Sequence, residues 1–196
     1  MAKGEETRQR IIEQAATYLN QRGYFSTAVS EIMAVTGLQK GGIYNHFSSK
    51  EELALEAFDY AIELVSRKFA EALQGKESAM DRLTAILGYF RGYSEDIPIA
   101  GGCPIMNCAI EGDDAHPALR DKARQAMDRF RNTFVRIIAK GMAQGEIRPD
   151  INPDAVTTFL ISALEGSVML SNLYKDPTHA RRVIDQLSLY VQTLKA

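Results

Sequence analysis

The stretch from Ala28 to Phe47, AVSEIMAVTGLQKGGIYNHF, predicts two short helices joined by a tight turn. Val29 and Ile32 lie three residues apart, the spacing that puts both side chains on one face of a helix. Gly37 can adopt the left-handed backbone conformation that commonly ends a helix. A second helix is expected to begin near Gln39, and the rest of the chain then serves to position this pair.

The second helix is expected to bury Ile43 and Phe47, which lie four residues apart. Its outward residues would then be Lys40, Gly41, Gly42, Tyr44, Asn45 and His46. Two adjacent glycines cost a helix about 1 kcal/mol each relative to alanine. Their presence predicts that a phosphate or a groove wall approaches the backbone closely there.

From Arg8 to Leu53 the sequence resembles the TetR-like one-component transcriptional repressors. The family pattern has a glycine after the first helix, a threonine four residues later, a helix-turn-helix, an aromatic end to the recognition helix and a Ser-Lys-Glu start to the next. The matching residues here are Gly23, Thr27, Ile32, Gly37, Gly41, Tyr44, His46, Phe47, Ser49, Lys50, Glu51 and Leu53. The resemblance implies a ligand-responsive, homodimeric repressor that binds a palindromic operator in double-stranded DNA and is released by a small-molecule effector.

The resemblance also predicts how the DNA is contacted. Tyr44 and His46 would donate hydrogen bonds to phosphates, and the matching threonine of the family meets a phosphate besides capping a helix. Ser48 with Glu51 fits a capping box, whose helix amides would bind phosphate together with Lys50. The residues expected at the DNA are Thr27, Gln39, Lys40, Gly41, Gly42, Tyr44, Asn45, His46 and Lys50.

Composition indicates an ordinary globular protein of 196 residues, 45% of them hydrophobic, with a formal charge of −2. Residues 1–50 carry six Lys or Arg against four acids, which is mild support for a DNA-binding half. No apolar run reaches the roughly 20 residues of a membrane span, and no signal peptide precedes the first helix. We therefore expect a cytoplasmic protein without a membrane partner.

The chain is expected to be all-α, with about nine helices and no strand. A three-helix DNA-binding domain would occupy residues 1–50, and a helical effector-binding and dimerisation bundle residues 51–196. Capping signals place helix starts at Ser78, Cys103-Pro104, Asn152-Pro153 and Asp176-Pro177.

Two sets of residues are assigned in the larger domain. The expected effector pocket consists of Phe58, Ile62, Tyr89, Phe90, Tyr93, Cys103, Met106, Phe130, Phe134, Glu165 and Met169, although such residues are also typical of a core. The last two helices would form a four-helix dimer interface through Phe159, Ala163, Leu170, Val183, Ile184, Leu187, Tyr190, Val191 and Leu194.

Two alternatives remain from the sequence. Cys103 at a helix start could be a reactive thiolate that makes the repressor a redox or electrophile sensor, whereas Cys108 is expected inside the helix. A small helical enzyme is the other alternative. The histidines His46, His116 and His179 show no metal-binding spacing, and no phosphate-binding loop or serine elbow is present, so neither a cofactor nor a metal is expected.

Overall fold

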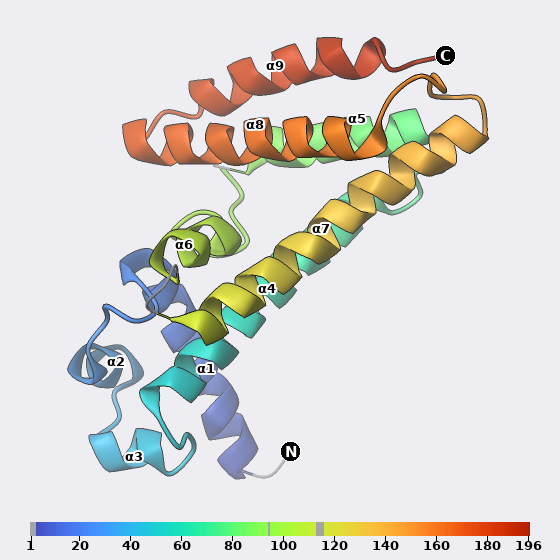
Figure 1. The fold of residues 1–196 in the computed structure, drawn as a ribbon. Coiled ribbons are helices and arrows are strands. Elements are labelled where there is room, and N and C mark those ends of the chain that lie inside the picture. Colours follow the sequence, from blue (N-terminus) through green and yellow to red (C-terminus); the bar gives the residue numbers. More distant parts are fainter. Residues whose placement is uncertain (1–2, 94, 113–115) are drawn as a thin grey trace. The chain divides into compact units, whose positions relative to one another are not determined.

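The computed structural model describes residues 3–93, 95–112 and 116–196. Within them the fold is all-α, as predicted, and its only extended pairing is an isolated bridge between Ile147 and Lys195. The helices in Figure 1 are α1 (Lys3–Arg22), α2 (Val29–Thr36), α3 (Lys40–Tyr44), α4 (Lys50–Leu73), α5 (Ala79–Gly92), α6 (Pro104–Glu111), α7 (Pro117–Ala143), α8 (Pro153–Tyr174) and α9 (Thr178–Gln192).

Side-chain caps are observed at several of the helix starts. The Ser78 hydroxyl accepts a hydrogen bond from the amide of Asp81, and Asn152 accepts from the two amides after Pro153. The start of α4 differs from the prediction by one residue, because Ser49 rather than Ser48 accepts the amide hydrogen bond, from Glu52. The predicted capping box of Ser48 with Glu51 is therefore wrong in register.

The chain forms two compact units that do not follow a single cut in the sequence. The N-terminal unit contains the described residues of 1–65 and 98–126, and the C-terminal unit those of 66–97 and 127–196. Helices α4 and α7 each contribute to both units, and α6 lies wholly in the N-terminal unit. The boundary predicted after residue 50 is a functional assignment and stays a prediction.

The N-terminal unit packs α1, α2 and α3 around a common apolar core. Ile32 of α2 is 1% exposed, and Ile43 and Phe47 are 3% and 2% exposed, as the spacing predicted. The guanidinium of Arg8 on α1 lies 4.7 Å from the centre of the Phe47 ring and also pairs with Glu56 on α4. These contacts connect Phe47, which lies in the turn after α3, through Arg8 to α1 and α4.

The C-terminal unit contains an aromatic cluster and a helix pair. The cluster joins α4, α5 and α7 through ring contacts among Phe69, Tyr89, Phe90, Tyr93, Phe130 and Phe134. Helix α9 packs along α8 and also contacts α5 (Figure 1). Among the described helices, only α8, with 22 residues, is long and apolar enough to cross a membrane. Core helices of globular proteins have the same length and composition, so this feature is weak evidence for a membrane span.

Four side chains of α9 and the following turn face this protomer's own core. Ile184, Leu187, Val191 and Leu194 are each at most 2% exposed in the single chain. Their assignment to the dimer interface is therefore a wrong prediction, because a second protomer cannot reach side chains that α5 and α8 already cover.

We expect Leu187→Ala to lower the free energy of unfolding by about 2–5 kcal/mol, because it leaves a cavity in a packed core. Chemical denaturation at fixed protein concentration measures this change, with Ile110→Ala, whose side chain is 74% exposed, as the control. Leu187→Asp should unfold the chain instead of releasing a folded monomer. A soluble, folded Leu187→Asp monomer would contradict this packing.

Candidate nucleic-acid interface

Helices α2 and α3 form the predicted helix-turn-helix. Gly37 ends α2 with φ of 67°, the left-handed conformation expected from the sequence. At the start of α2 the Glu31 carboxylate accepts a hydrogen bond from the amide of Ala28 at 2.8 Å and one from the Tyr18 hydroxyl at 3.0 Å. These hydrogen bonds to the charged form hold the pKa of Glu31 below its usual value.

The outward face of α3 is polar and accessible. Its exposed residues are Gln39, Lys40, Gly41, Tyr44 and Asn45, and Gly42 and His46 are half-buried. The Lys40 ammonium lies 5.9 Å from the centre of the Tyr44 ring, so the cation and the phenol occupy one surface. The structure thus brings these seven predicted DNA-contacting residues together on one short segment.

The two glycines of α3 have no role within the chain. A Cβ atom added at Gly41 would have no neighbour within 4 Å, and one at Gly42 would meet Leu38 at an ordinary 3.6 Å. Neither residue has the positive φ that favours glycine, since neither is among the positive-φ residues of the described chain. Their helix-weakening cost is thus not explained by folding, which fits an external group that approaches the backbone.

Thr27 does not have its predicted role. Its side chain is 2% exposed, and its hydroxyl donates a 2.6 Å hydrogen bond to the carbonyl of Gly23. The residue that caps α2 is Ala28. The predicted helix cap by Thr27 is therefore wrong, and its buried hydroxyl is unavailable to a phosphate.

Lys50 lies at the start of α4 and is half-buried, with its ammonium donating to the carbonyl of Phe25. The sequence did not suggest this contact, because the two residues are far apart in the chain. An ammonium has two further donors, so the phosphate contact of Lys50 stays a prediction.

The predicted effector residues do not form one described cluster. The aromatic cluster of the C-terminal unit includes five of them, namely Tyr89, Phe90, Tyr93, Phe130 and Phe134. Glu165 of α8 belongs to the same unit. Phe58, Ile62, Cys103 and Met106 belong to the N-terminal unit, where Phe58 packs edge-on against Tyr24. Met169 is 45% exposed on α8 in the single chain, and its assignment to the effector pocket stays a prediction.

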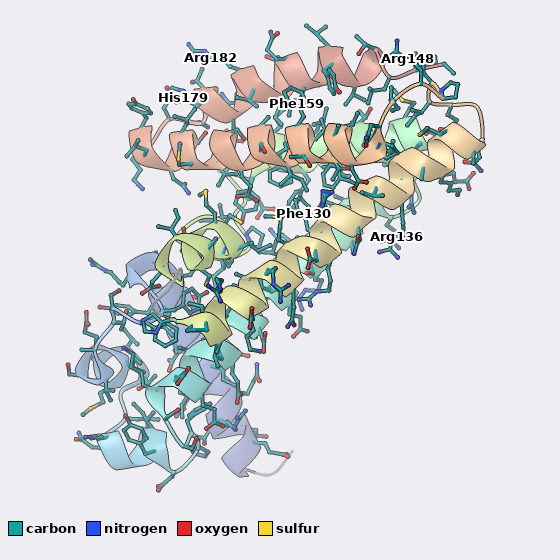
Figure 2. All side chains as sticks on the ribbon, in the orientation of Figure 1. Phe130, Arg136, Arg148, Phe159, His179 and Arg182 are labelled. Atoms are coloured by element: carbon teal, nitrogen blue, oxygen red, sulfur yellow. The ribbon has the colours of Figure 1, made fainter. Side chains whose placement is uncertain are left out.

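The predicted interface on α8 and α9 keeps five of its nine residues at the surface of the chain. Phe159 is 49% exposed, and Ala163, Leu170, Val183 and Tyr190 are half-buried. Phe159 contacts Tyr190 with ring centres 4.8 Å apart, which connects the outer faces of the two helices. Figure 2 shows Phe159 on α8, and Arg182 and His179 on α9. Leu173, exposed by 69%, lies on the same side of α8 as Phe159 and was missed by the sequence prediction.

The cysteines do not support a thiol sensor. Cys103 is the residue before α6, as predicted, but its side chain makes no capping hydrogen bond and is 6% exposed. Cys108 is fully buried, and this burial raises the pKa of its thiol. Neither cysteine forms a disulfide. The thiols lie in the core of the N-terminal unit, where reagents have little access.

The described residues show no arrangement typical of a metal-dependent active site. Among the described residues no group of three His, Cys, Asp or Glu side chains could hold a metal ion. A surface cavity of about 240 Å³ in the C-terminal unit is lined by Arg82, Arg136 and Lys140, a convergence of cations from α5 and α7 that the sequence pattern did not reveal.

Comparison with known proteins connects both halves of the chain to one family. Residues 11–57 match the family described as bacterial regulatory proteins, tetR family, and residues 79–187 match the tetracyclin repressor-like C-terminal domain. The HTH-type transcriptional repressor DhaR of Mycobacterium sp. strain GP1 is 26% identical over 179 residues, covering 91% of this chain and 87% of its own.

Two solved structures are similar over the full chain. A TetR transcriptional regulator from Chloroflexus aurantiacus is 46% identical with a TM-score of 0.95, and the match covers 100% of this chain and 98% of that one. A regulator from Cytophaga hutchinsonii is 30% identical with a TM-score of 0.90 and the same coverage.

The glycine pair gives a test of the interface. We expect the double variant Gly41→Ala, Gly42→Ala to raise the free energy of unfolding by about 0.5–1 kcal/mol per site, because alanine favours the helix and both sites have room. DNA affinity should fall by about tenfold, which corresponds to roughly 1.4 kcal/mol of lost contact. Thermal melts and gel shifts measure the two effects, with Gly88→Ala on α5 as a control that should affect stability alone. Unchanged DNA affinity would refute the close approach.

Proposed function

The chain belongs to the TetR family of transcriptional regulators, and on this premise we propose that it is a repressor whose two recognition helices read a palindromic operator. It is a ligand-responsive DNA-binding regulator, and regulators of this family act as dimers. The observation that carries the proposal is the exposed polar face of α3, with its unexplained glycine pair, above the buried Ile43 and Phe47.

We assign two kinds of DNA contact on this face. Tyr44 and His46 donate to phosphates and set the docking register, whereas Gln39, Lys40, Gly42 and Asn45 lie nearest the base edges. In a two-fold dimer the half-sites face the same side of the duplex, about 34–36 Å apart or a multiple of that distance.

The dimer surface is assigned to the outer face of α8 and α9. Its members share apolar character, surface exposure and a common side of each helix: Phe159, Ala163, Leu170, Leu173, Val183 and Tyr190. A contiguous exposed apolar strip is costly in water and marks an interaction surface. A second copy of the same strip would cover it in an isologous interface.

The effector is assigned to the C-terminal unit. Its aromatic cluster offers ring faces and edges from α4, α5 and α7, which suit an apolar or aromatic small molecule. An effector releases the operator if it binds more tightly to a conformation that does not fit DNA. The loss of DNA affinity is then set by the difference between the effector's affinities for the two conformations.

The enzyme alternative has no specific observation in its favour, and the family consists of transcriptional regulators. A regulator that binds operator DNA works in the compartment that contains this DNA, so the proposal includes a cytoplasmic location. It includes no membrane partner. Its proposed partners are double-stranded DNA, a small-molecule effector and a second copy of the chain.

Base contact is tested by Lys40→Ala and Asn45→Ala. Each should change the preferred base at one operator position, because a side chain at a base edge carries sequence information. Selection from a randomised operator library measures the preference. Tyr44→Phe is the phosphate-contact control, and it should weaken all sequences alike. A uniform loss of affinity for all three variants would place Lys40 and Asn45 outside the groove.

The dimer surface is tested by Phe159→Asp. A carboxylate without a partner is costly inside an apolar interface, so this variant should sediment as a monomer and lose operator affinity. Its circular dichroism should remain that of a folded chain, because Phe159 is 49% exposed in the single chain. The control is Ile110→Asp, at a side chain of α6 that is 74% exposed, and this variant should stay dimeric. A dimeric Phe159→Asp protein would show that the interface lies elsewhere.

A further inference from the structure

The loop between α1 and α2 sets the direction in which the recognition helices leave α1. Gly23 begins this loop with φ of 104°, and the Ser26 hydroxyl donates back to the carbonyl of Arg22 at 2.9 Å. The three amides that follow Gly23 all donate to a single carboxylate, that of Glu111. The donors are Tyr24 at 2.5 Å, Phe25 at 2.8 Å and Ser26 at 2.9 Å.

Glu111 is the last residue of α6, and a second set of bonds attaches this helix to the same end of α1. The Asn107 amide, one turn earlier, donates to the Asn20 carbonyl at 3.0 Å and to the Gly101 carbonyl at 3.1 Å. The Asn20 amide in turn donates to the carbonyls of Ala100 and Gly102.

The chain before α6 is pressed closely against α1. A Cβ atom at Gly101 would lie 2.5 Å from the carbonyl oxygen of Asn20, and Gly101 has φ of 109°. Only glycine fits there without displacing the backbone. The docking of α6 on the end of α1 is thus specified by close packing as well as by hydrogen bonds.

The same loop is bound by a second helix. Lys50, at the start of α4, donates to the carbonyl of Phe25, the residue whose amide binds Glu111. Both α4 and the segment 98–126, which carries α6, continue along the chain into the C-terminal unit. The loop that orients α2 and α3 is therefore held by side chains from two segments that lead to the effector-binding half.

We propose that Glu111 is a positioning residue for operator recognition, whose carboxylate fixes the orientation of α2 and α3 through the three loop amides. This proposal rests on the proposed function, in which α3 reads the operator. Burial by itself would raise the pKa of Glu111, but the hydrogen bonds from Ser26, Phe25 and Tyr24 outweigh it and hold the pKa below its usual value. The group that binds the amides is thus a carboxylate at neutral pH, and charged acceptors make the stronger hydrogen bonds.

The test compares Glu111→Gln with Glu13→Gln in the dimer. Both variants remove one negative charge from the N-terminal unit, but Glu13 is exposed on α1, accepts a hydrogen bond from Gln9 and does not contact the loop. The probes are the best duplex that the wild-type protein selects from a randomised library and two duplexes with the half-site spacing changed by one base pair in either direction. Circular dichroism first establishes a temperature at which all three proteins are folded.

We expect Glu111→Gln to weaken binding to the best duplex by about tenfold, because a hydrogen bond to a charged group is replaced by weaker neutral ones. The ratio of affinities between the best duplex and the altered spacings should fall by at least about threefold, because a loosened recognition unit discriminates spacing less well. A loss of folded protein alone would lower every affinity by one factor and leave this ratio unchanged. Glu13→Gln should keep the wild-type ratio.

An unchanged ratio in Glu111→Gln, or an equal change in Glu13→Gln, overturns the proposal. Hydrogen exchange of the amides of residues 24–26 is a second measurement that needs no DNA, and it should accelerate at least about tenfold in Glu111→Gln alone. If the wild-type protein selects no duplex, the proposed function has failed, and the exchange rates alone then decide whether Glu111 holds the loop.

Discussion

The burial of Ile43 and Phe47 is the constraint on which the DNA-facing surface depends. A helix of five residues has almost no stability of its own, since nucleation costs more than its few hydrogen bonds return. Helix α3 is held in place because its Ile43, and Phe47 in the turn that follows it, enter the core of the N-terminal unit, where Arg8 of α1 covers the Phe47 ring. The outward residues can therefore be chosen for DNA contact, even when, as with two glycines, they weaken the helix.

The loop between α1 and α2 likewise depends on residues that are distant in the sequence. The loop after α1 is anchored by the fully buried Tyr24, whose ring packs against Phe58, and by charged side chains from elsewhere in the chain, Glu111 on its amides and Lys50 on a carbonyl. Its backbone position therefore depends on residues of α4 and α6 as well as on its own sequence. Helix α6, attached by Glu111 and Asn107, is in this respect part of the DNA-binding unit, although it lies far from it in sequence.

Helix α8 has apolar side chains on two of its faces. Its inner face, with Leu160 and Leu164, is buried against the core of the C-terminal unit, whereas Phe159 and Leu173 remain exposed. Regulators of this family act as dimers, and in the dimer proposed above a second copy would cover this exposed face. The proposed interface would thus account for the apolar residues of α8 that the core does not bury.

The sequence by itself determined the helical class, most helix starts and the outward face of α3, because caps such as Ser78 and turns such as Gly37 act within about four residues. It also identified the family through the spacing of its N-terminal residues. Only the tertiary structure decided which apolar face of α9 belongs to the protomer, since periodicity marks both Leu187 and Tyr190 as interior. It likewise decided that Thr27 and Cys103 are buried, and that Glu111 binds the loop after α1. These outcomes depend on contacts between residues distant in the chain, which no local pattern encodes.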